Sequence, residues 1–370
     1  MKPRDIKQLA EAVKAAKAPF ELIGRGTKRA LGRPVAASPL DLSAFNKVIA
    51  YEPEELILEC GAATKLHDIQ KLLRKHSQML AFEPPDYSTL LSGEHSGSIG
   101  GVLSCNLSGP RRLKAGAARD HILGVTGVNG SGEIIKAGAR VVKNVTGYDV
   151  PRLLAGSYGT LLALTSVIFK VLPAPETEQT LHFKCKDVPQ AISLMALALQ
   201  TSADVSSAAY LPTHGFYVRL EGIAASVTFR RDVLLKAVTV GYEILQEEES
   251  RHLWSGLRDA APMQKFTNKH IWRVSIPPMD APRFLASVGN VNYYCDWAGG
   301  LIWLAAAKAL DVRRHITQGH AMLFRADAEA RDRMQVFHPQ PPALSALSAR
   351  VKHAFDPQGL FNPGRMYKGI

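Results

Sequence analysis

Short apolar runs alternate with helical patterns along the first part of the chain. Residues 6–13 carry apolar side chains three to four positions apart, as on one face of a helix, whereas Phe20–Ile23 is a run of strand length. Residues 47–51 and 56–60 are further strand candidates, and residues 64–73 repeat the helical spacing behind Thr64, which we expect to cap that helix. The pattern predicts a small α/β unit.

The pattern changes between residues 80 and 117, where prolines and then repeated glycines interrupt the chain. Apolar Ile99, Val102 and Leu103 lie between the glycines, so we expect a functional loop and not a disordered one. Strands at 122–128 and 133–136 follow, joined by a Gly-rich turn, then a helix at 149–155 and an apolar strand at 161–172.

Pro173 and Pro175 end this region, and we place a domain boundary there. Residues 176–335 mix strand and helix patterns without a phosphate loop, which predicts an α+β domain on an antiparallel sheet. Within it, residues 291–297 and 301–306 flank Ala298-Gly299-Gly300 and predict a hairpin. A proline-rich linker at 338–342 then leads into a final helix at 344–355.

Composition narrows the function classes. The 370 residues fit two domains, and no apolar run reaches the roughly 20 residues of a membrane-spanning helix or forms a secretory signal. The four cysteines are far apart, which favours a reduced intracellular chain and excludes the usual Cys₄ iron–sulfur motif within it. The net charge of +12 suits anionic cofactors, acidic partners or a membrane face, whereas no nucleic-acid motif accompanies it.

The first segment with candidate chemistry is Gly24-Arg25-Gly26-Thr27-Lys28, directly after the first strand. Glycines allow a sharp turn that points backbone N–H groups at one place, an arrangement suited to a pyrophosphate. It is neither a Walker loop nor the dinucleotide fingerprint, since position 29 is arginine. Taken alone, it is better explained by a plain β-turn with basic neighbours.

Three later segments carry similar chemistry. Residues 96–106 combine hydroxyls, a glycine pair and Asn106, which suits a planar or phosphate-bearing ligand, although a flexible surface loop explains them equally. Residues 143–149 and 156–161 bracket a short helix, which ordinary capping also explains. Residues 360–365 are by themselves only a turn.

Together, these segments resemble the PCMH-type FAD-binding fold of the vanillyl-alcohol oxidase superfamily, and more narrowly the FAD-binding subunits of bacterial glycolate oxidase (glycolate dehydrogenase) complexes. Pro84-Pro85-Asp86 and Asn362-Pro363-Gly364 also carry the likeness, which spans residues 20–172 and 350–366. It implies a PCMH-type FAD-binding domain over 1–175, an α+β cap domain with an antiparallel sheet over 176–335, and a C-terminal segment over 336–370 that returns to the FAD domain.

The resemblance also assigns cofactor contacts. The matching positions lie in the first pyrophosphate loop, the Pro-Asp pair, the segment along the ribityl chain and flavin edge, the region over the adenine, and the C-terminal return. In chain order they are Gly24, Arg25, Gly26, Thr27, Lys28, Pro85, Asp86, Ser98, Gly100, Gly101, Ser104, Asn106, Gly159, Ile168 and Asn362.

Two departures from the family pattern bear on the chemistry. Covalent members often carry a histidine in the first loop, and residues 20–34 contain none, so the resemblance implies non-covalent FAD; Cys105 is better explained as a buried thiol than as a linkage. Members that oxidise 2-hydroxy acids carry His-x-Gly-Asp-Gly-Asn-x-His in the cap, whereas the cap histidines here are scattered. We therefore expect no metal site, and oxidation of the substrate on a related partner subunit.

The leading interpretation is an FAD subunit of a glycolate-oxidising complex, with electrons passing through an iron–sulfur partner to a quinone. The expected partners are a homologous flavin subunit and an iron–sulfur subunit, in the cytoplasm or attached peripherally at the inner face of the cell membrane. No nucleic-acid partner is expected. The alternatives are an autonomous flavin oxidoreductase of another substrate, a scaffold subunit with a degenerate flavin pocket, and a charge-driven membrane or nucleic-acid binder.

Overall fold

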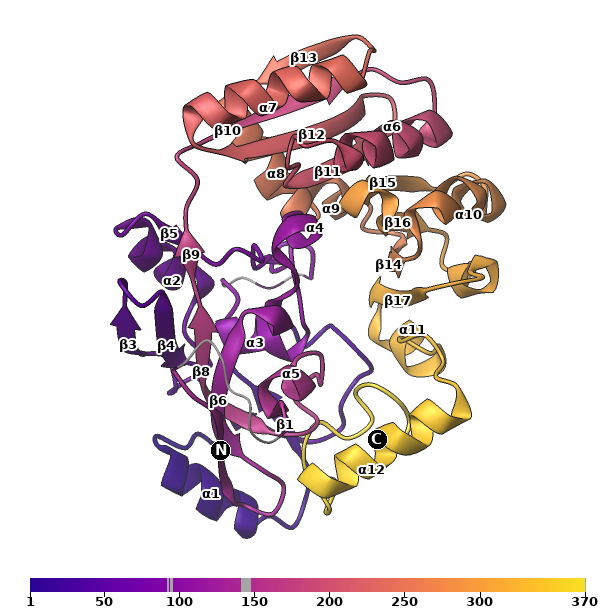
Figure 1. Cartoon of the computed structure of the whole chain (residues 1–370). Coiled ribbons are helices and arrows are strands. Elements are labelled where there is room, and N and C mark those ends of the chain that lie inside the picture. The colour runs from indigo at the N-terminus through magenta and orange to yellow at the C-terminus, as the bar shows by residue number, and fades with distance from the viewer. Residues whose placement is uncertain (92, 94–95, 141–147, 370) are drawn as a thin grey trace. The chain divides into compact units, whose positions relative to one another are not determined.

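The computed structural model describes residues 1–91, 93, 96–140 and 148–369, and the chain divides into two compact units. Unit 1 comprises Met1–Ser108, Ala117–Pro173 and Asp327–Ile370, and unit 2 comprises Gly109–Gly116 and Ala174–Ala326. Each unit contains helices and its own antiparallel sheet, so the predicted α+β class is confirmed (Figure 1). No helix in the described ranges is both long and apolar enough to cross a membrane.

Unit 1 is organised by a five-stranded sheet in the order β3-β4-β8-β6-β7, in which all neighbours are antiparallel. A parallel pair, β1-β2, and an antiparallel pair, β5-β9, accompany it. The elements are α1 (Ile6–Lys14), β1 (Phe20–Ile23), β2 (Ser38–Asp41), β3 (Val48–Glu52), β4 (Ile57–Gly61), α2 (Leu66–Arg74), β5 (Gln78–Met79), α3 (Ile99–Ser104), η1 (Ala118–Asp120), β6 (Ile122–Val128), β7 (Ile134–Gly138), α5 (Val150–Leu154), β8 (Ala163–Lys170), β9 (Leu172–Pro173), α11 (Ala328–Arg333) and α12 (Pro342–Phe355).

The central strand β8 is buried along nearly its whole length, as its continuous apolar sequence predicts. The predicted cap of α2 is wrong: the helix begins at Leu66, and its N-cap is Lys65, which makes no side-chain cap. The reason is a long-range contact, because Leu66 N donates to Gly97 O at 3.0 Å and Lys65 bridges Ser98. The glycine-rich segment therefore supplies a hydrogen-bond acceptor for the first backbone N–H of α2, and the same contact fixes the position of the segment.

The C-terminal residues return to the first strand of unit 1. Phe20 N donates to Leu360 O at 2.7 Å, and Asn362 N donates to Phe20 O at 2.9 Å, which makes residues 360–362 a short extension beside β1. Leu360 and Phe361 share a buried apolar cluster with Leu9 and Val13 of α1. Burial of these side chains fixes the position of Asn362 next to the end of β1.

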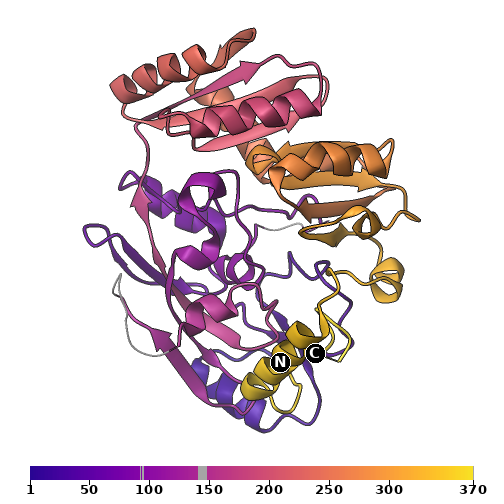
Figure 2. The same cartoon turned by 45° about the vertical axis from the view of Figure 1, so that its right-hand side comes forward.

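Unit 2 is built on an eight-stranded antiparallel sheet in the order β13-β10-β12-β11-β15-β16-β14-β17. The helix α6 packs on β11 and β12 (Figure 2). The predicted hairpin is confirmed as β15-β16. The elements are α4 (Arg112–Ala115), β10 (Thr177–Phe183), α6 (Val188–Gln200), β11 (Ser207–Leu211), β12 (Gly215–Gly222), α7 (Ala224–Ala237), β13 (Tyr242–Leu245), α8 (Glu247–Arg258), α9 (Ala261–Gln264), β14 (His270–Ser275), η2 (Pro278–Asp280), α10 (Ala281–Val288), β15 (Asn292–Asp296), η3 (Trp297–Gly299), β16 (Leu301–Ala306), η4 (Val312–His315) and β17 (His320–Arg325).

A buried carboxylate, Glu221 of β12, holds the segment Gly109–Gly116 in unit 2. Its oxygens accept hydrogen bonds from Arg111 Nε at 2.9 and 3.0 Å, and one lies 3.6 Å from Arg219 Nε. Burial by itself would raise the pKa of Glu221, but the two guanidinium groups outweigh it and lower that pKa to about 2.

Replacing Glu221 by glutamine should flatten the acid dependence of stability. Because the pKa falls from 4.5 in the reference state to about 2 in the fold, the carboxylate stabilises the folded chain above pH 4.5, and this stabilisation disappears as the pH falls toward 2. Wild type should lose on the order of 3 kcal/mol over this window, and E221Q, which starts less stable, should lose clearly less in urea unfolding. Exposed Glu329 supplies the control E329Q; equal slopes for E221Q and wild type would contradict the assignment.

Candidate cofactor site

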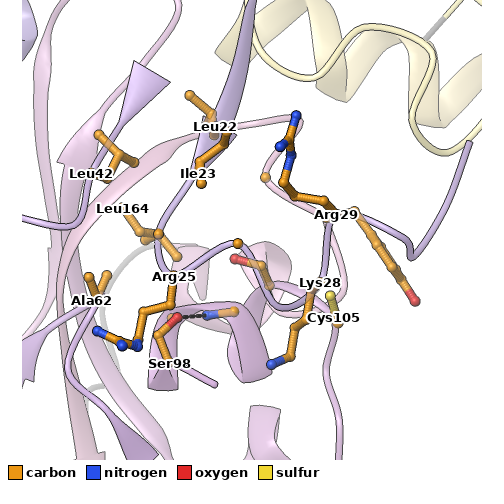
Figure 3. A pocket seen from close by; sticks show the side chains of 18 of the residues that line it. Leu22, Ile23, Arg25, Lys28, Arg29, Leu42, Ala62, Ser98, Cys105 and Leu164 are labelled. Atoms are coloured by element: carbon orange, nitrogen blue, oxygen red, sulfur yellow. Dashed lines mark hydrogen bonds between the residues drawn. The ribbon is translucent and has the colours of Figure 1, made fainter. Parts of the chain in front are cut away.

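A pocket in unit 1 is bounded by the end of β1, the loop that follows it, the start of α3, the turn at residues 157–160 and the C-terminal return (Figure 3). The space between its lining atoms, its open mouth included, is about 780 Å³. The predicted cofactor residues that line it are Gly24, Arg25, Gly26, Thr27, Lys28, Ser98, Gly100, Gly101, Ser104, Gly159 and Asn362.

The loop after β1 is built around Gly26, whose φ of 78° is a conformation that side chains disfavour. The turn is closed by a hydrogen bond from Arg29 N to Gly26 O at 3.3 Å. Arg25 Nε donates to Ser96 O at 2.9 Å and so ties this loop to the second glycine-rich segment. The two segments that the sequence places about 70 residues apart therefore form one wall.

Gly100 brings the second segment unusually close to β4. Its N–H donates to Ala62 O at 2.8 Å, and a Cβ added at Gly100 would lie 2.6 Å from that oxygen. Ser98 caps α3 by accepting a hydrogen bond from Gly101 N at 3.3 Å. Glycine at position 100 is thus required by the close approach of two backbones and not by its dihedral angles.

Lys28 is the central cation of the pocket. Burial lowers the pKa of its ammonium, although the nearby Cys105 and Asp86 favour the charged form, and its Nζ makes no hydrogen bond to any residue in the described ranges. Burial would raise the pKa of Asp86, but hydrogen bonds from Ser88 and Gly97 and the charge of Lys28 lower it overall. The carboxylate therefore stays ionised near a lysine whose Nζ has no acceptor among the residues that the structure describes.

Two arginines at the other side of the pocket share one acid. Arg29 and Arg365 both donate to the buried Glu21, at 2.6–3.0 Å and 2.9 Å. Arg365 Nη1 also donates to Leu31 O at 2.9 Å, while its Nε is buried with no partner among the described residues. With Arg25 and Lys28, the lining carries more positive than negative charge, which favours an anionic ligand.

Asn362 acts as a clamp between three segments. Its Oδ1 accepts from Leu22 N at 2.9 Å, and its Nδ2 donates to Tyr158 O at 2.9 Å and Gly159 O at 3.2 Å. Both amide hydrogens are thus used by the backbone, and Asn362 itself has a left-handed φ of 44°. Its side chain shapes the pocket by holding the turn at 158–159 against β1.

Four predicted contacts lie outside the lining. Pro85 is buried in its loop, and Asp86 accepts from Gly97 N at 3.1 Å behind the wall. Asn106 accepts from Arg119 N at 3.2 Å, and Ile168 lies in the sheet on β8. The cofactor role of these four stays a prediction. Residues 143–147 of the third candidate segment fall outside the described ranges, and Asp149 caps α5 through Arg152 N at 3.2 Å.

The apolar part of the lining was not predicted. Leu42, Ala62 and Leu164 line the pocket together with Leu22 and Ile23 (Figure 3). Nothing distinguishes these residues from other strand residues in the sequence. Arg365, by contrast, could have been predicted as a lining residue, because it directly follows the Asn-Pro-Gly turn.

The lining fits FAD in its donor chemistry. Glycines and Ser98 allow close approach to the backbone, unneutralised cations suit a pyrophosphate, and the leucines and alanines suit a flat apolar ring. The residues best placed to hold the phosphates are Lys28, whose Nζ makes no hydrogen bond within the described ranges, and Arg365, whose Nε is buried without a partner among the described residues.

Replacing Lys28 by methionine should weaken FAD binding about 10- to 100-fold, because hydrogen bonds to charged groups contribute about 1.5–3 kcal/mol. Since burial lowers the pKa of Lys28, wild-type affinity should fall as the pH rises through that pKa, and K28M should lack this step. Affinity is read by fluorescence titration of the apoprotein, with K28R and K71M as controls, the latter at an exposed lysine of α2 outside the pocket lining. Unchanged affinity in K28M would remove Lys28 from the site.

The histidines of the cap region lie on separate elements. His182 of β10 contacts His214 O at 2.8 Å and stacks on Tyr217, whereas His270 is buried on β14. Among the described residues, no group of three or more histidine, cysteine, aspartate or glutamate side chains is arranged to hold a metal ion.

Residues 1–138 match a family described as FAD binding domain. The chain is 33% identical over 365 residues to the glycolate oxidase subunit GlcE of Escherichia coli strain K12, covering 98% of this chain and 96% of that protein. Over 131 residues it is 37% identical to the glycolate oxidase subunit GlcD of Bacillus subtilis strain 168, covering 35% of this chain and 26% of that protein. A solved alkyldihydroxyacetonephosphate synthase shares the fold, with a TM-score of 0.68 over 98% of this chain and 75% of that one, at 14% identity.

Proposed function

Because the chain belongs to the PCMH-type FAD-binding family that includes the glycolate oxidase subunit GlcE, we propose that it holds FAD in a multi-subunit glycolate dehydrogenase and passes electrons to an iron–sulfur partner and a quinone. The FAD cofactor and the FAD-dependent oxidoreductase class, both expected from the sequence, are confirmed by these relatives. The observation that carries the proposal is the match to GlcE along nearly the whole chain, cap region included.

Bound FAD supplies the redox chemistry. The protein's part is placement: Lys28 and Arg365 would hold the pyrophosphate, the glycines would let it approach the backbone, and Asn362 fixes the turn at residues 158–159. The apolar residues Leu42 and Leu164 would keep water from the flavin ring. Placing FAD in this way requires no general base from this chain.

The proposal includes dissociable FAD. The loop at residues 20–34 has no histidine. Burial raises the pKa of Cys105 to about 11, although Lys28 and Arg365 lower it somewhat, so the thiol stays protonated at neutral pH and is a poor nucleophile. Release of all flavin on denaturation in acid, with none left on the chain, is the result that this part of the proposal requires.

Glycolate itself is oxidised, in this proposal, on a homologous flavin subunit. The scattered placement of the cap histidines supports this division of labour. The assembly would lie in the cytoplasm, attached peripherally to the inner face of the cell membrane where the quinone is reached.

The test is co-expression with the neighbouring genes, followed by affinity purification and quantification of flavin and iron. We expect a second flavin protein and an iron–sulfur protein to co-purify, and glycolate to bleach the flavin of the complex but not that of the isolated chain. The variant K28M should assemble with less flavin. An isolated chain that turns over glycolate with an artificial acceptor, or a complex without iron, would refute the proposal.

A further inference from the structure

Glu21 of β1 is a buried carboxylate beside a pocket that suits an anion. Only 5% of the residue is exposed, and it does not line the pocket, whereas its partners Arg29 and Arg365 do. A negative charge in this place opposes the binding of another negative charge nearby. A carboxylate here therefore calls for a compensating role, and its contacts indicate which one.

The first role of Glu21 is to hold the end of the Arg365 side chain. Glu21 Oε1 accepts from Arg365 Nη2 at 2.9 Å, while Arg365 Nη1 donates to Leu31 O at 2.9 Å. Separate acceptors on two nitrogens fix the plane of a guanidinium, because the group is rigid and flat. The third nitrogen, Nε, is buried without a partner among the described residues. Arg365 therefore forms part of the pocket wall in a fixed orientation, with one donor unused.

The backbone near Arg365 holds the other end of the side chain. Arg33 N donates to Arg365 O at 2.8 Å, and a Cβ added at Gly32 would lie 2.9 Å from Arg365 Cγ. Among the acceptors of the guanidinium, Leu31 O belongs to the backbone and Glu21 is a side chain. The contact with Glu21 is thus the one that a substitution can remove.

The second role of Glu21 is to offset repulsion between cations. Arg29 Nε and Nη2 donate to it at 3.0 and 2.6 Å, and Arg331 lies near enough to Arg365 for their charges to repel. Burial lowers the pKa of Arg365, and the charge and hydrogen bond of Glu21 oppose that fall. Without this carboxylate, Arg365 would keep two guanidinium neighbours and lose its carboxylate partner, so we expect its side chain to move away from them.

From these contacts we propose that Glu21 is a positioning residue for FAD that acts through Arg365, by holding the guanidinium in the orientation in which it meets the pyrophosphate. The inference rests on the proposed function, because it takes FAD as the ligand of the pocket. It also reverses the sign that charge alone predicts. Removing an anion beside the pocket should strengthen the binding of a pyrophosphate, whereas removing the residue that positions Arg365 should weaken it.

The test is a double-mutant cycle in FAD affinity, measured by fluorescence titration of the full apoprotein chain for wild type, E21Q, R365Q and the double variant. R365Q should weaken binding about 10- to 100-fold, the range for hydrogen bonds to charged groups. E21Q should weaken it by the larger part of that factor, and adding E21Q to R365Q should change affinity by less than about 2-fold. General damage to the fold would instead multiply the two losses, because such damage does not act through Arg365.

The matched control is E59Q on β4. Glu59 also accepts hydrogen bonds from an arginine of unit 1, Arg140, and it lies outside the pocket lining, so E59Q should bind FAD as wild type does. If the thermal midpoint shows that E21Q does not fold, R365K carries the comparison. Lysine keeps the charge but cannot reach Glu21 and Leu31 together, and R365K should bind FAD about 10-fold more weakly.

Three results would overturn the inference while leaving the flavin assignment intact: unchanged or tighter FAD binding in E21Q, losses that multiply in the double variant, or unchanged affinity in R365K. If wild type itself does not bind FAD, the proposed function fails, and this inference fails with it.

Discussion

Replacing Lys352 by methionine should lower the free energy of unfolding by about 3–5 kcal/mol, as expected when one partner of a buried ion pair is removed. Lys352 Nζ donates to Asp356 Oδ2 at 2.6 Å, Thr160 O at 2.7 Å and Phe361 O at 2.9 Å, which uses all its hydrogens. Without it, the fully buried Asp356 loses its counterion. Urea unfolding at neutral pH measures the loss.

The variant also tests how α12 is attached. Asp356 accepts from Leu360 N at 2.9 Å and Phe361 N at 2.7 Å, so the pair joins the helix end to the segment beside β1. H353A, at an exposed neighbour on the same helix, is the control and should change stability by less than about 0.5 kcal/mol. A loss below about 1 kcal/mol in K352M would show that the buried pair is not what holds this segment.

Replacing Gly100 by valine should reduce FAD affinity by more than about 100-fold, equivalent to about 2.7 kcal/mol. The new Cβ would lie 2.6 Å from Ala62 O and 2.7 Å from Ala62 Cβ, contacts that only a shift of α3 away from β4 can relieve. That shift would move Ser98 and Gly101 out of the pocket wall. Flavin content after purification and reconstitution titration measure the effect.

The control for this variant is G256A on α8, where an added Cβ meets no atom closer than 3.8 Å. It should keep full flavin content and gain a little stability, because alanine favours the helix. If G100V lowered the thermal midpoint of the apoprotein so far that binding could not be compared, G100A would give the smaller step in the same direction. Normal flavin content in G100V would contradict the close packing described here.

Local chemistry made part of the site predictable. Gly26 and Gly100 stand in short glycine-rich runs whose backbone requirements are visible in the sequence. The apolar wall was not predictable, because Leu42 follows β2 and Leu164 lies on β8, and these strands belong to different sheets that only the tertiary fold brings together at the pocket. For the same reason β2 escaped prediction: it contains Pro39, and its place is set by parallel pairing with β1.

Long-range contacts also explain why the predicted cap of α2 was wrong and why the sequence did not predict that Gly109–Gly116 belongs to unit 2. Thr64 has the residue type of a helix cap, yet Gly97 satisfies the start of α2 instead. Gly109–Gly116 belongs to unit 2 although its sequence neighbours belong to unit 1. The contact that fixes it, Arg111 to Glu221, joins positions 110 residues apart and leaves no local signal.

Because Asn362 and Arg365 line the pocket, the pocket is completed only when the end of the chain has been synthesised. A nascent chain that has not yet reached residue 365 lacks both the clamp on the turn at 158–159 and one of the two cations that we propose for the phosphates. On this proposal, flavin binds late, after the ribosome has delivered the C-terminal residues.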